Sequence, residues 1–358
     1  MKNIGTRLSV VLIALAIAAV GWFTLNKSQS KAESIAIRVL ESTAPTQWEL
    51  VKKLTGRDIL DEENVTLEPV QSVQSGGGTV SLQALLANNV DTAGSAWPAW
   101  INIIAHGGKI KALLGTIVST KENKSGTSGL LVLEESSIRT IKDLVGKRIA
   151  VNVLGAEADY VIRQYLKNNG VSISQVELVV VPSENQEQML RSRQVDAVAW
   201  TTSGGPYFDI TVENGGVREI PGTRNFDTKG ETVLYGIGFR NDFIDKHPDA
   251  VRKYIRAYDT SRRILYTEFH KNPDRVRKAY EEIATKKGSN PRMARYYEAS
   301  SWTPKFPFIA DKDLQWWIDR FTENGLLKPG QIRPTDIYTN EFNPLYKKNG
   351  VDESLNSR

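Results

Sequence analysis

Short apolar runs alternate along the chain with longer segments in which apolar residues recur every three or four positions. The short runs are rich in β-branched residues, which predicts strands at residues 35–40, 65–70, 90–93, 112–118, 148–153, 176–181 and 195–199. The longer segments predict helices at residues 45–54, 79–87, 158–168 and 184–193. Strands that alternate with helices are typical of an α/β fold with largely parallel sheets.

The last third of the chain has a different pattern. From Pro248 onward it is mostly helical, with aromatic-rich stretches such as residues 254–269 and 314–321. We interpret these aromatic side chains as packing residues rather than cofactor contacts. Because 358 residues are too many for an average single domain, we expect two lobes.

Two segments of the chain resemble each other. Residues 85–91 read Leu-Leu-Ala-Asn-Asn-Val-Asp and residues 190–196 read Leu-Arg-Ser-Arg-Gln-Val-Asp, and each leads to a tryptophan, Trp97 or Trp200. Each segment predicts a helix that runs into a strand. Two copies are too few for a solenoid, so the repeat is either a chance recurrence or one equivalent unit in each lobe.

The N-terminus has the pattern of an export signal. Lys2 and Arg7 precede an apolar run at residues 8–23, and a polar stretch rich in small residues comes after it. Small residues stand where a signal peptidase requires them for a cut after Ser30 or Ala32. The apolar run is long for a signal and short for a relaxed membrane span, so an uncleaved anchor is the alternative.

Charge and composition exclude several classes of function. Residues 1–32 hold four basic groups and no acidic one, so the formal net charge of +5 falls to +1 when this segment is removed. A chain so close to neutral gives little support to nucleic-acid binding. The chain has no cysteine, which excludes disulfides, thiolate zinc sites and cysteine nucleophiles. Its three histidines lack the spacing of a metal site, and we expect neither a metal nor a cofactor.

Residues 137–151, Ser-Ile-Arg-Thr-Ile-Lys-Asp-Leu-Val-Gly-Lys-Arg-Ile-Ala-Val, resemble the signature of the periplasmic aliphatic-sulfonate, taurine and nitrate binding proteins. Further segments match that family in order, at residues 160–170, 179–182, 194–197 and 243–249. The resemblance runs from about residue 34 to about residue 342. It implies an α/β, two-lobed periplasmic binding protein fold of type II, with two crossing hinge strands near residues 125–132 and 232–239.

The resemblance also implies the organisation and the partners of the chain. We expect a signal peptide or anchor at residues 1–32, a first lobe from residues 33–125 plus 236–358, and a second lobe at residues 126–235. The expected function is an extracytoplasmic, periplasmic solute-binding subunit of an ABC importer, which performs no chemistry. Its partners would be a small organic anion or zwitterion and a membrane permease with its cytoplasmic ATPase, and we expect a monomer that binds no nucleic acid.

In open α/β sheets, ligands collect beyond the carboxyl ends of the strands, where helix N-termini carry partial positive charge. Three loops of the first lobe fit that description, including a glycine run whose amides allow close approach to an anion. A flexible turn is the alternative for the glycine run, and core packing is the alternative for the tryptophan of the third loop. The candidate ligand-binding residues of these loops are Ser42, Thr43, Gln47, Trp48, Gly77, Gly78, Thr79, Ser95, Ala96 and Trp97.

The second lobe contributes two loops, and one crossing strand adds a tyrosine. The candidates here are Gly155, Ala156, Glu157, Trp200, Thr201 and Tyr235. The sequence departs from the family at Ala156, where relatives place a hydroxyl residue, and Glu157 and Asp159 come shortly after it. These carboxylates either complement the helix dipole, which we favour, or face a cationic group of the ligand.

Two other functions are weighed against solute capture. A pyrimidine-synthesising branch shares the fold, but its iron-binding, cysteine-rich motif cannot exist in a chain without cysteine. A membrane-tethered sensor domain is the second alternative, and it requires that residues 8–23 stay attached. The ligand itself is left open among sulfonates, sulfate esters, taurine, nitrate-like anions and zwitterions.

Overall fold

The computed structural model describes residues 35–42, 44–71, 77–119, 129–200, 207–297, 308–343, 346–347 and 350–351. The chain divides into two compact units, Met1–Ala36 and Ile37–Arg358, and nearly all of the described residues belong to the second unit. The expected export signal, Thr43 and Thr201 lie outside the described residues.

Five strands build the first group of sheets. They are β1 (Ala36–Leu40), β2 (Thr66–Val70), β3 (Thr92–Ala96), β4 (Ile110–Gly115) and β12 (Tyr235–Arg240). Strand β1 pairs with β2, whereas β12 lies between β3 and β4 and is antiparallel to both. β12, the last of these strands in the sequence, therefore lies at the centre of the β3–β12–β4 sheet.

Arg38 and Asp91 join the β1–β2 pair to the β3–β12–β4 sheet. The backbone amide of Asp91 donates to the Arg38 carbonyl at 2.9 Å, and the Arg38 amide donates to Asp91 Oδ2 at 2.9 Å. The Arg38 guanidinium also binds the Asp91 carboxylate, with 2.6 Å between Nη2 and Oδ1. β1 and β3 are thus joined near Asp91, although the two strands do not pair with each other in a ladder.

The second sheet has the strand order β10-β6-β9-β7-β8. Its strands are β6 (Leu130–Leu133), β7 (Arg148–Val151), β8 (Glu177–Val180), β9 (Ala197–Ala199) and β10 (Val217–Glu219). Strand β7 is parallel to β8 and β9, and β6 is antiparallel to β9 and β10. The predicted α/β class with parallel strand pairs is confirmed for this sheet.

The two repeated sequence segments occupy equivalent places in the two groups of strands. Asp196 donates its amide to the Arg148 carbonyl at 2.9 Å and accepts the Arg148 amide at 2.8 Å, as Asp91 does with Arg38. The residue three positions earlier has a positive φ in both copies, 61° at Asn88 and 59° at Arg193. The repeat is therefore structural rather than a chance recurrence.

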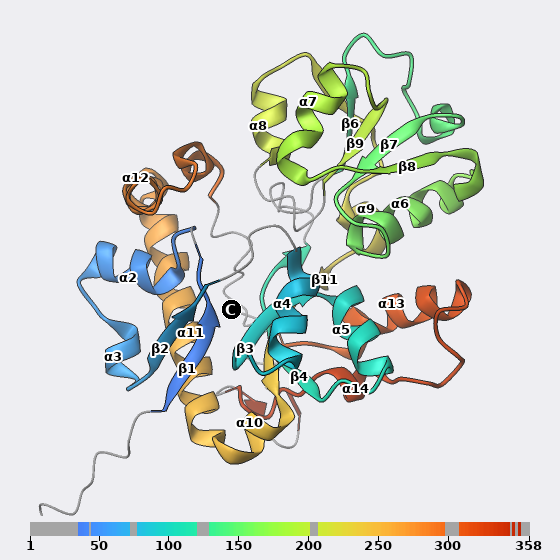
Figure 1. Ribbon diagram of the computed structural model, residues 1–358. Helices are drawn as coiled ribbons and strands as arrows, with labels where there is room; N and C mark the ends of the chain where they lie inside the picture. Colours follow the sequence, from blue (N-terminus) through green and yellow to red (C-terminus); the bar gives the residue numbers. More distant parts are fainter. Residues whose placement is uncertain are drawn as a thin grey trace, which may run out of the picture. The chain divides into compact units, whose positions relative to one another are not determined.

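Helices cover both faces of the second sheet (Figure 1). Ile149 and Val151 face the side of α6, where Val161 and Ile162 join the same core cluster. Ala150 and Val198 face the opposite side, with Leu190 of α7 and Phe208 of α8 in their cluster. These helices are α6 (Glu157–Asn168), α7 (Gln186–Arg191) and α8 (Tyr207–Glu213).

The remaining helices are, in chain order, α2 (Gln47–Thr55), α3 (Ile59–Glu62), α4 (Gly77–Leu86), α5 (Trp97–Ala105), α9 (Asn225–Lys229), α10 (Asn241–Lys246), α11 (Pro248–Lys271), α12 (Pro273–Lys286), α13 (Asp311–Glu323) and α14 (Pro334–Ile337). Short 3₁₀ turns are η1 (Ile141–Leu144), η2 (Ile173–Gln175), η3 (Ser183–Asn185) and η5 (Pro291–Tyr296). Within the described ranges, no helix combines the length and the apolar character that a membrane span needs.

Two chain passages run side by side between the sheets. Strand β5 (Val118–Ser119) comes after the first sheet and pairs in antiparallel register with β11 (Thr232–Val233), which precedes β12. The second predicted crossing, residues 232–239, coincides with β11 and β12, and much of the first lies outside the described residues. A short hairpin of β13 (Tyr346–Lys347) and β14 (Gly350–Val351) ends the described chain.

Candidate ligand-binding site

A cavity of about 630 Å³ opens where β1 and β3 separate beyond the Arg38–Asp91 contact. Its walls come from the end of β1 and the residues after it, from α4, from β3 and β12, and from α11. The lining residues are Val39, Leu40, Glu41, Ser42, Ala44, Ser81, Thr92, Ala93, Gly94, Tyr235, Ile237 and Tyr254. The cavity therefore lies beside the carboxyl end of β1, where an open α/β sheet is expected to bind its ligand.

Two neutral tyrosines form part of the cavity wall. Burial raises the pKa of Tyr235 to about 12, and burial likewise raises the pKa of Tyr254 to about 12. Both phenols therefore keep their proton at neutral pH and are able to donate a hydrogen bond to a ligand. Tyr235 was among the predicted residues, whereas Tyr254 was assigned to packing.

Trp48 supports this wall from behind. Its ring meets the rings of Tyr254 and Tyr258 edge-on, with 5.8 Å between centroids in each pair. Gln47, the first residue of α2, has a buried side-chain Nε2 with no hydrogen-bond acceptor among the described residues. Helix α2 thus places an aromatic brace and an unused amide donor near the end of β1.

The glycine run leads into helix α4, which starts at Gly77. A Cβ atom at Gly78 would lie 2.2 Å from Ser95 Oγ, so only glycine lets the helix pack this closely on β3. Thr79 is half-buried in the first turn. The interpretation of Gly78 as a flexible turn is wrong, because it lies inside a helix and serves close packing.

Ser95, Ala96 and Trp97 lie at the end of β3 and the start of α5. Ser95 is 2% exposed, and Ala96 pairs in register with Tyr235. Trp97 is fully buried, and its Nε1 donates to the Val233 carbonyl at 2.7 Å. The structure gives the Trp97 indole a packing role, which was the alternative to cleft lining, and ligand contact by this residue stays a prediction.

Three of the predicted residues of the second lobe lie at the N-terminus of α6. Gly155 has a φ of 73° and donates its amide to Asp159 Oδ2 at 2.8 Å, and Ala156 is the N-cap. Glu157 and Asp159 both lie in the first helical turn, where the helix dipole favours a carboxylate. The favoured interpretation of the acidic pair therefore agrees with their positions.

Glu157 already has a cationic partner within the protein. Lys229 Nζ lies 3.4 Å from Glu157 Oε1, and the two side chains are 2% and 3% exposed. The ammonium group also lies 4.3 Å from the centroid of the Trp317 ring. Burial lowers the pKa of Lys229 to about 8, although the Glu157 carboxylate opposes that shift. A ligand cation is thus not needed to explain the buried carboxylate.

Trp200 directly follows strand β9 and does not line the cavity. It is 2% exposed, and its Nε1 donates to the Ser183 carbonyl at 3.1 Å. Among the described residues, the cavity is lined by the first group of strands and its helices alone. Of the predicted ligand-binding residues, Ser42 and Tyr235 line this cavity. Ligand contact by the other candidates stays a prediction.

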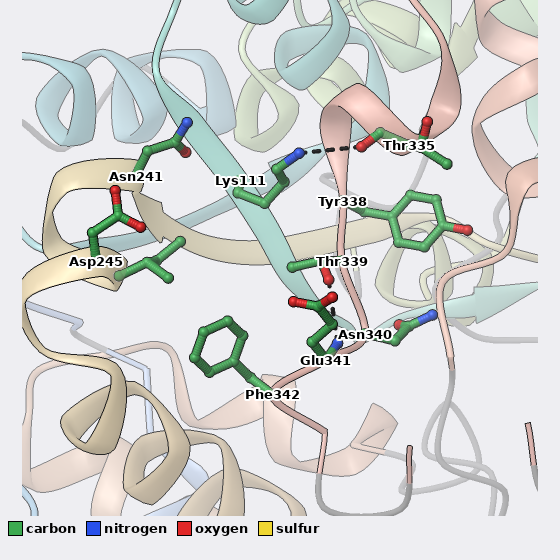
Figure 2. A pocket seen from close by; sticks show the side chains of 10 residues that line it. Lys111, Asn241, Asp245, Thr335, Tyr338, Thr339, Asn340, Glu341 and Phe342 are labelled. Carbon is green, nitrogen blue, oxygen red and sulfur yellow. Dashed lines mark hydrogen bonds between the residues drawn. The ribbon is translucent and has the colours of Figure 1, made fainter. Parts of the chain in front are cut away.

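A second cavity, of about 590 Å³, lies beside the amino end of β4 (Figure 2). Lys111 Nζ donates to the carbonyls of Thr335 and Asp336, at 3.1 Å each. Burial lowers the pKa of Lys111, and the carboxylates of Asp336 and Glu341 oppose the shift. This cavity lies at the amino end of β4. Because ligands of open α/β sheets bind beyond the carboxyl ends of the strands, we favour the first cavity as the ligand site.

The cavity residues that the sequence did not indicate come from helix faces and strand interiors. Ser81 lies one helical turn after the glycine run, and Thr92 donates its hydroxyl to the Gly238 carbonyl at 2.9 Å. Tyr254 and Tyr258 are four residues apart on α11. Two tyrosines spaced four residues apart, and therefore on one helix face, were the available signal for this wall.

Comparison with solved structures identifies the fold. The chain resembles the periplasmic aliphatic sulphonate binding protein SsuA from Escherichia coli, with a TM-score of 0.65, 17% identity, and 84% of this chain and 91% of that chain covered. It also resembles the alkanesulfonate-binding protein SsuA from Xanthomonas axonopodis pv. citri bound to MOPS, with a TM-score of 0.65 and 19% identity over 86% of this chain and 99% of that one. The two-lobed, type II periplasmic binding protein fold is therefore confirmed.

The family is shown by the sequence itself. The family model described as NMT1/THI5 like matches residues 61–276, which is more than half of the chain, so the chain belongs to the NMT1/THI5-like family. No curated protein matches the chain significantly. The same fold also occurs in the desulfurization enzyme DSZB, with a TM-score of 0.58 and 14% identity over 89% of this chain and 99% of that one.

Proposed function

We propose that this protein is the extracytoplasmic solute-binding subunit of an ABC importer and that the cavity beside β1 and β3 holds its ligand. The ligand would be a small organic anion such as an aliphatic sulfonate, taurine or a sulfate ester. The protein would make and break no bond of the ligand and would deliver it to a membrane permease with a cytoplasmic ATPase. We propose a periplasmic location and the lobe boundaries that the sequence predicts.

The observation that supports this proposal most is the lining of the cavity. Ser42, Ser81 and Tyr235, which each carry a hydroxyl group, line it, and no lysine or arginine is among its described lining residues. Neutral donors satisfy an anion's oxygens without the desolvation cost of a second buried charge. Ser81 lies in the N-terminal half of α4, a helix whose N-terminus carries partial positive charge.

Thermal unfolding of the protein lacking residues 1–32 tests the proposal. The panel contains an alkanesulfonate, taurine, a sulfate ester and nitrate. A true ligand at about 100 times its dissociation constant should stabilise the protein by roughly 2.7 kcal/mol. A panel without any stabilising compound would remove small organic anions as the ligand class.

Glu41 on the cavity wall favours a zwitterion such as taurine over nitrate-like anions. Glu41→Gln should weaken taurine binding up to about fivefold, because an exposed ion pair contributes at most about 1 kcal/mol. The same change should leave a simple alkanesulfonate unaffected or bound more tightly. Glu341→Gln, in the second cavity, is the matched control. Equal affinity of wild type and Glu41→Gln for taurine would favour the simple anions.

A membrane-tethered sensor is the second candidate function. It differs from the first only in whether residues 8–23 stay attached to the mature protein. Sequencing the N-terminus of the exported protein separates the two functions. A start near residue 31 or 33 supports the free binding protein, and an intact N-terminus supports the anchored sensor.

A further inference from the structure

Among the described residues, helices that cover the second sheet contact other elements through side chains of two kinds. The first is polar and lies at the end of α8. The Glu213 carboxylate accepts hydrogen bonds from Arg292, Arg295 and Tyr296, which all belong to η5. Asn214 Oδ1 also accepts from Arg292 Nη2, at 3.1 Å. Four polar contacts thus converge on two residues at one helix end.

The two sides of this polar contact belong to separate hydrophobic cores. In η5, Ala294 packs in a cluster with Leu50 and Val276, while Phe208 of α8 packs in a cluster with Leu131. Among the described residues, the two clusters share no member. The side chains of Glu213, Arg292 and Arg295 are 35%, 50% and 66% exposed. Water can replace these partners, so the contact breaks at little cost.

The second contact lies between α6 and α13 and is mainly apolar, with one exposed ion pair between Lys167 and Glu323. Tyr160 stacks on Phe321 with 4.8 Å between ring centroids and meets Trp317 edge-on at 6.1 Å. All three residues belong to one core cluster. The buried Lys229 ammonium over the Trp317 ring adds to this contact. Separating α6 from α13 would expose aromatic surface and a buried ion pair, which is costly.

From this difference we propose that the second sheet opens at the α8–η5 side while the α6–α13 side stays closed, and that Glu213 is the latch that holds the closed form. Glu213 is then a positioning residue that governs ligand retention without touching the ligand. The latch lies on the side of the cavity, because Ala44 lines the cavity and its carbonyl accepts from Lys287 Nζ at 3.3 Å, four residues before η5. The role in retention rests on the proposed function, whereas the opening itself does not.

The protein has no cysteine, so pairs of introduced cysteines can carry spin labels at defined positions. One pair, Val212→Cys with Lys286→Cys, spans the latch side, and both positions are exposed. The other pair, Asn168→Cys with Asp319→Cys, spans the α6–α13 side and is exposed as well. Pulsed electron paramagnetic resonance measures both distances in the protein without any ligand.

Glu213→Ala should lengthen and broaden the distance between positions 212 and 286 and leave the distance between 168 and 319 unchanged. Glu213→Gln, which keeps an acceptor for the three donors, should fall between Ala and wild type. The control is Glu268→Ala, because Glu268 binds Lys271 and Arg275 away from α8. An unchanged 212–286 distance in Glu213→Ala, or equal lengthening of both distances, would overturn the proposal.

Ligand retention gives the second readout, with taurine and an alkanesulfonate as probes. Glu213→Ala should accelerate their dissociation about two- to fivefold, the scale of an exposed ion-pair network. High salt should shrink the difference between variant and wild type, because salt screens exposed charges. If neither probe binds the wild type, the proposed function is wrong for these ligands. The distances between the spin labels then still test whether Glu213 holds the closed form.

Discussion

At the scale of single residues, Lys229 has an unusual environment for a lysine. Its ammonium is buried between the Glu157 carboxylate and the Trp317 ring, and burial lowers its pKa from 10.5 to about 8. A lysine whose pKa falls on folding binds fewer protons in the native state. The free energy of unfolding should therefore rise with pH between about 8 and 10.5.

Lys229→Met tests this linkage. Between pH 7.5 and 9.5 the wild type should gain about 2 kcal/mol of stability from Lys229, and the variant should lose that gain. The window ends below pH 10 because Tyr235 and Tyr254, whose pKa values are raised to about 12, act in the opposite direction at higher pH. Urea denaturation at the two pH values measures the slope. The same rise in Lys229→Met would show that another group titrates.

The sequence could predict the position of Glu157 in a first helical turn but not its partner. Lys229 is 72 residues away in the sequence, and Trp317 lies on a helix near the C-terminus. Local periodicity carries no information on such long-range pairs. Cavity residues show the same limit, since Tyr254 was predicted to be on a packed helix face, and only the folded chain brings it to β3.

At the scale of elements, the repeated Arg–Asp pair offers two matched positions in different surroundings. Asp91 is 5% exposed and binds both Arg38 and Arg240, whereas Asp196 is 32% exposed, with 3.5 Å to Arg148 Nε. The Arg38 and Arg240 side chains hold the pKa of Asp91 below its ordinary value, although burial opposes them. The same junction is therefore buried in one copy and solvated in the other.

Asparagine substitution should separate the two copies. Asp91→Asn should destabilise the fold by about 3 to 5 kcal/mol, because it leaves a partly buried arginine cluster without its carboxylate. Asp196→Asn should cost no more than about 1 kcal/mol, the usual value for an exposed pair. Urea denaturation near pH 7 compares them. Equal losses would mean that the burial difference between the copies has no energetic consequence.

The bounds of helices and strands were easier to predict from the sequence than contacts between distant residues. Residues 148–153 were predicted as a strand and β7 spans Arg148–Val151, and the helix predicted at residues 158–168 is α6, Glu157–Asn168. The strand predicted at residues 90–93 begins later, at Thr92, because Asp91 is used to join β1 and β3. Helix α5 was not predicted as such, since its first residues, Trp97 and Pro98, also suit a loop.

At the scale of the whole molecule, the family resemblance predicted the two-lobed fold, whereas periodicity predicted only the α/β class. The alternation of strands and helices indicated an α/β chain but not the order of the strands in each sheet. In the structure, β12 lies between β3 and β4 and β6 lies between β9 and β10, each antiparallel to both neighbours. Ligand capture by this fold is the central claim, and it depends on the cavity beside β1 and β3.

Calorimetric titration of the protein lacking residues 1–32 tests that claim most directly. The titrants are an alkanesulfonate, taurine and a sulfate ester, and the variants are Tyr235→Phe in the cavity and Tyr338→Phe in the second cavity. We predict saturable binding of one ligand per protein, weakened about fivefold by Tyr235→Phe through loss of one hydrogen bond of about 1 kcal/mol, and unchanged in Tyr338→Phe. Absence of binding for all three compounds, or equal affinity in wild type and Tyr235→Phe, would contradict ligand capture at this cavity.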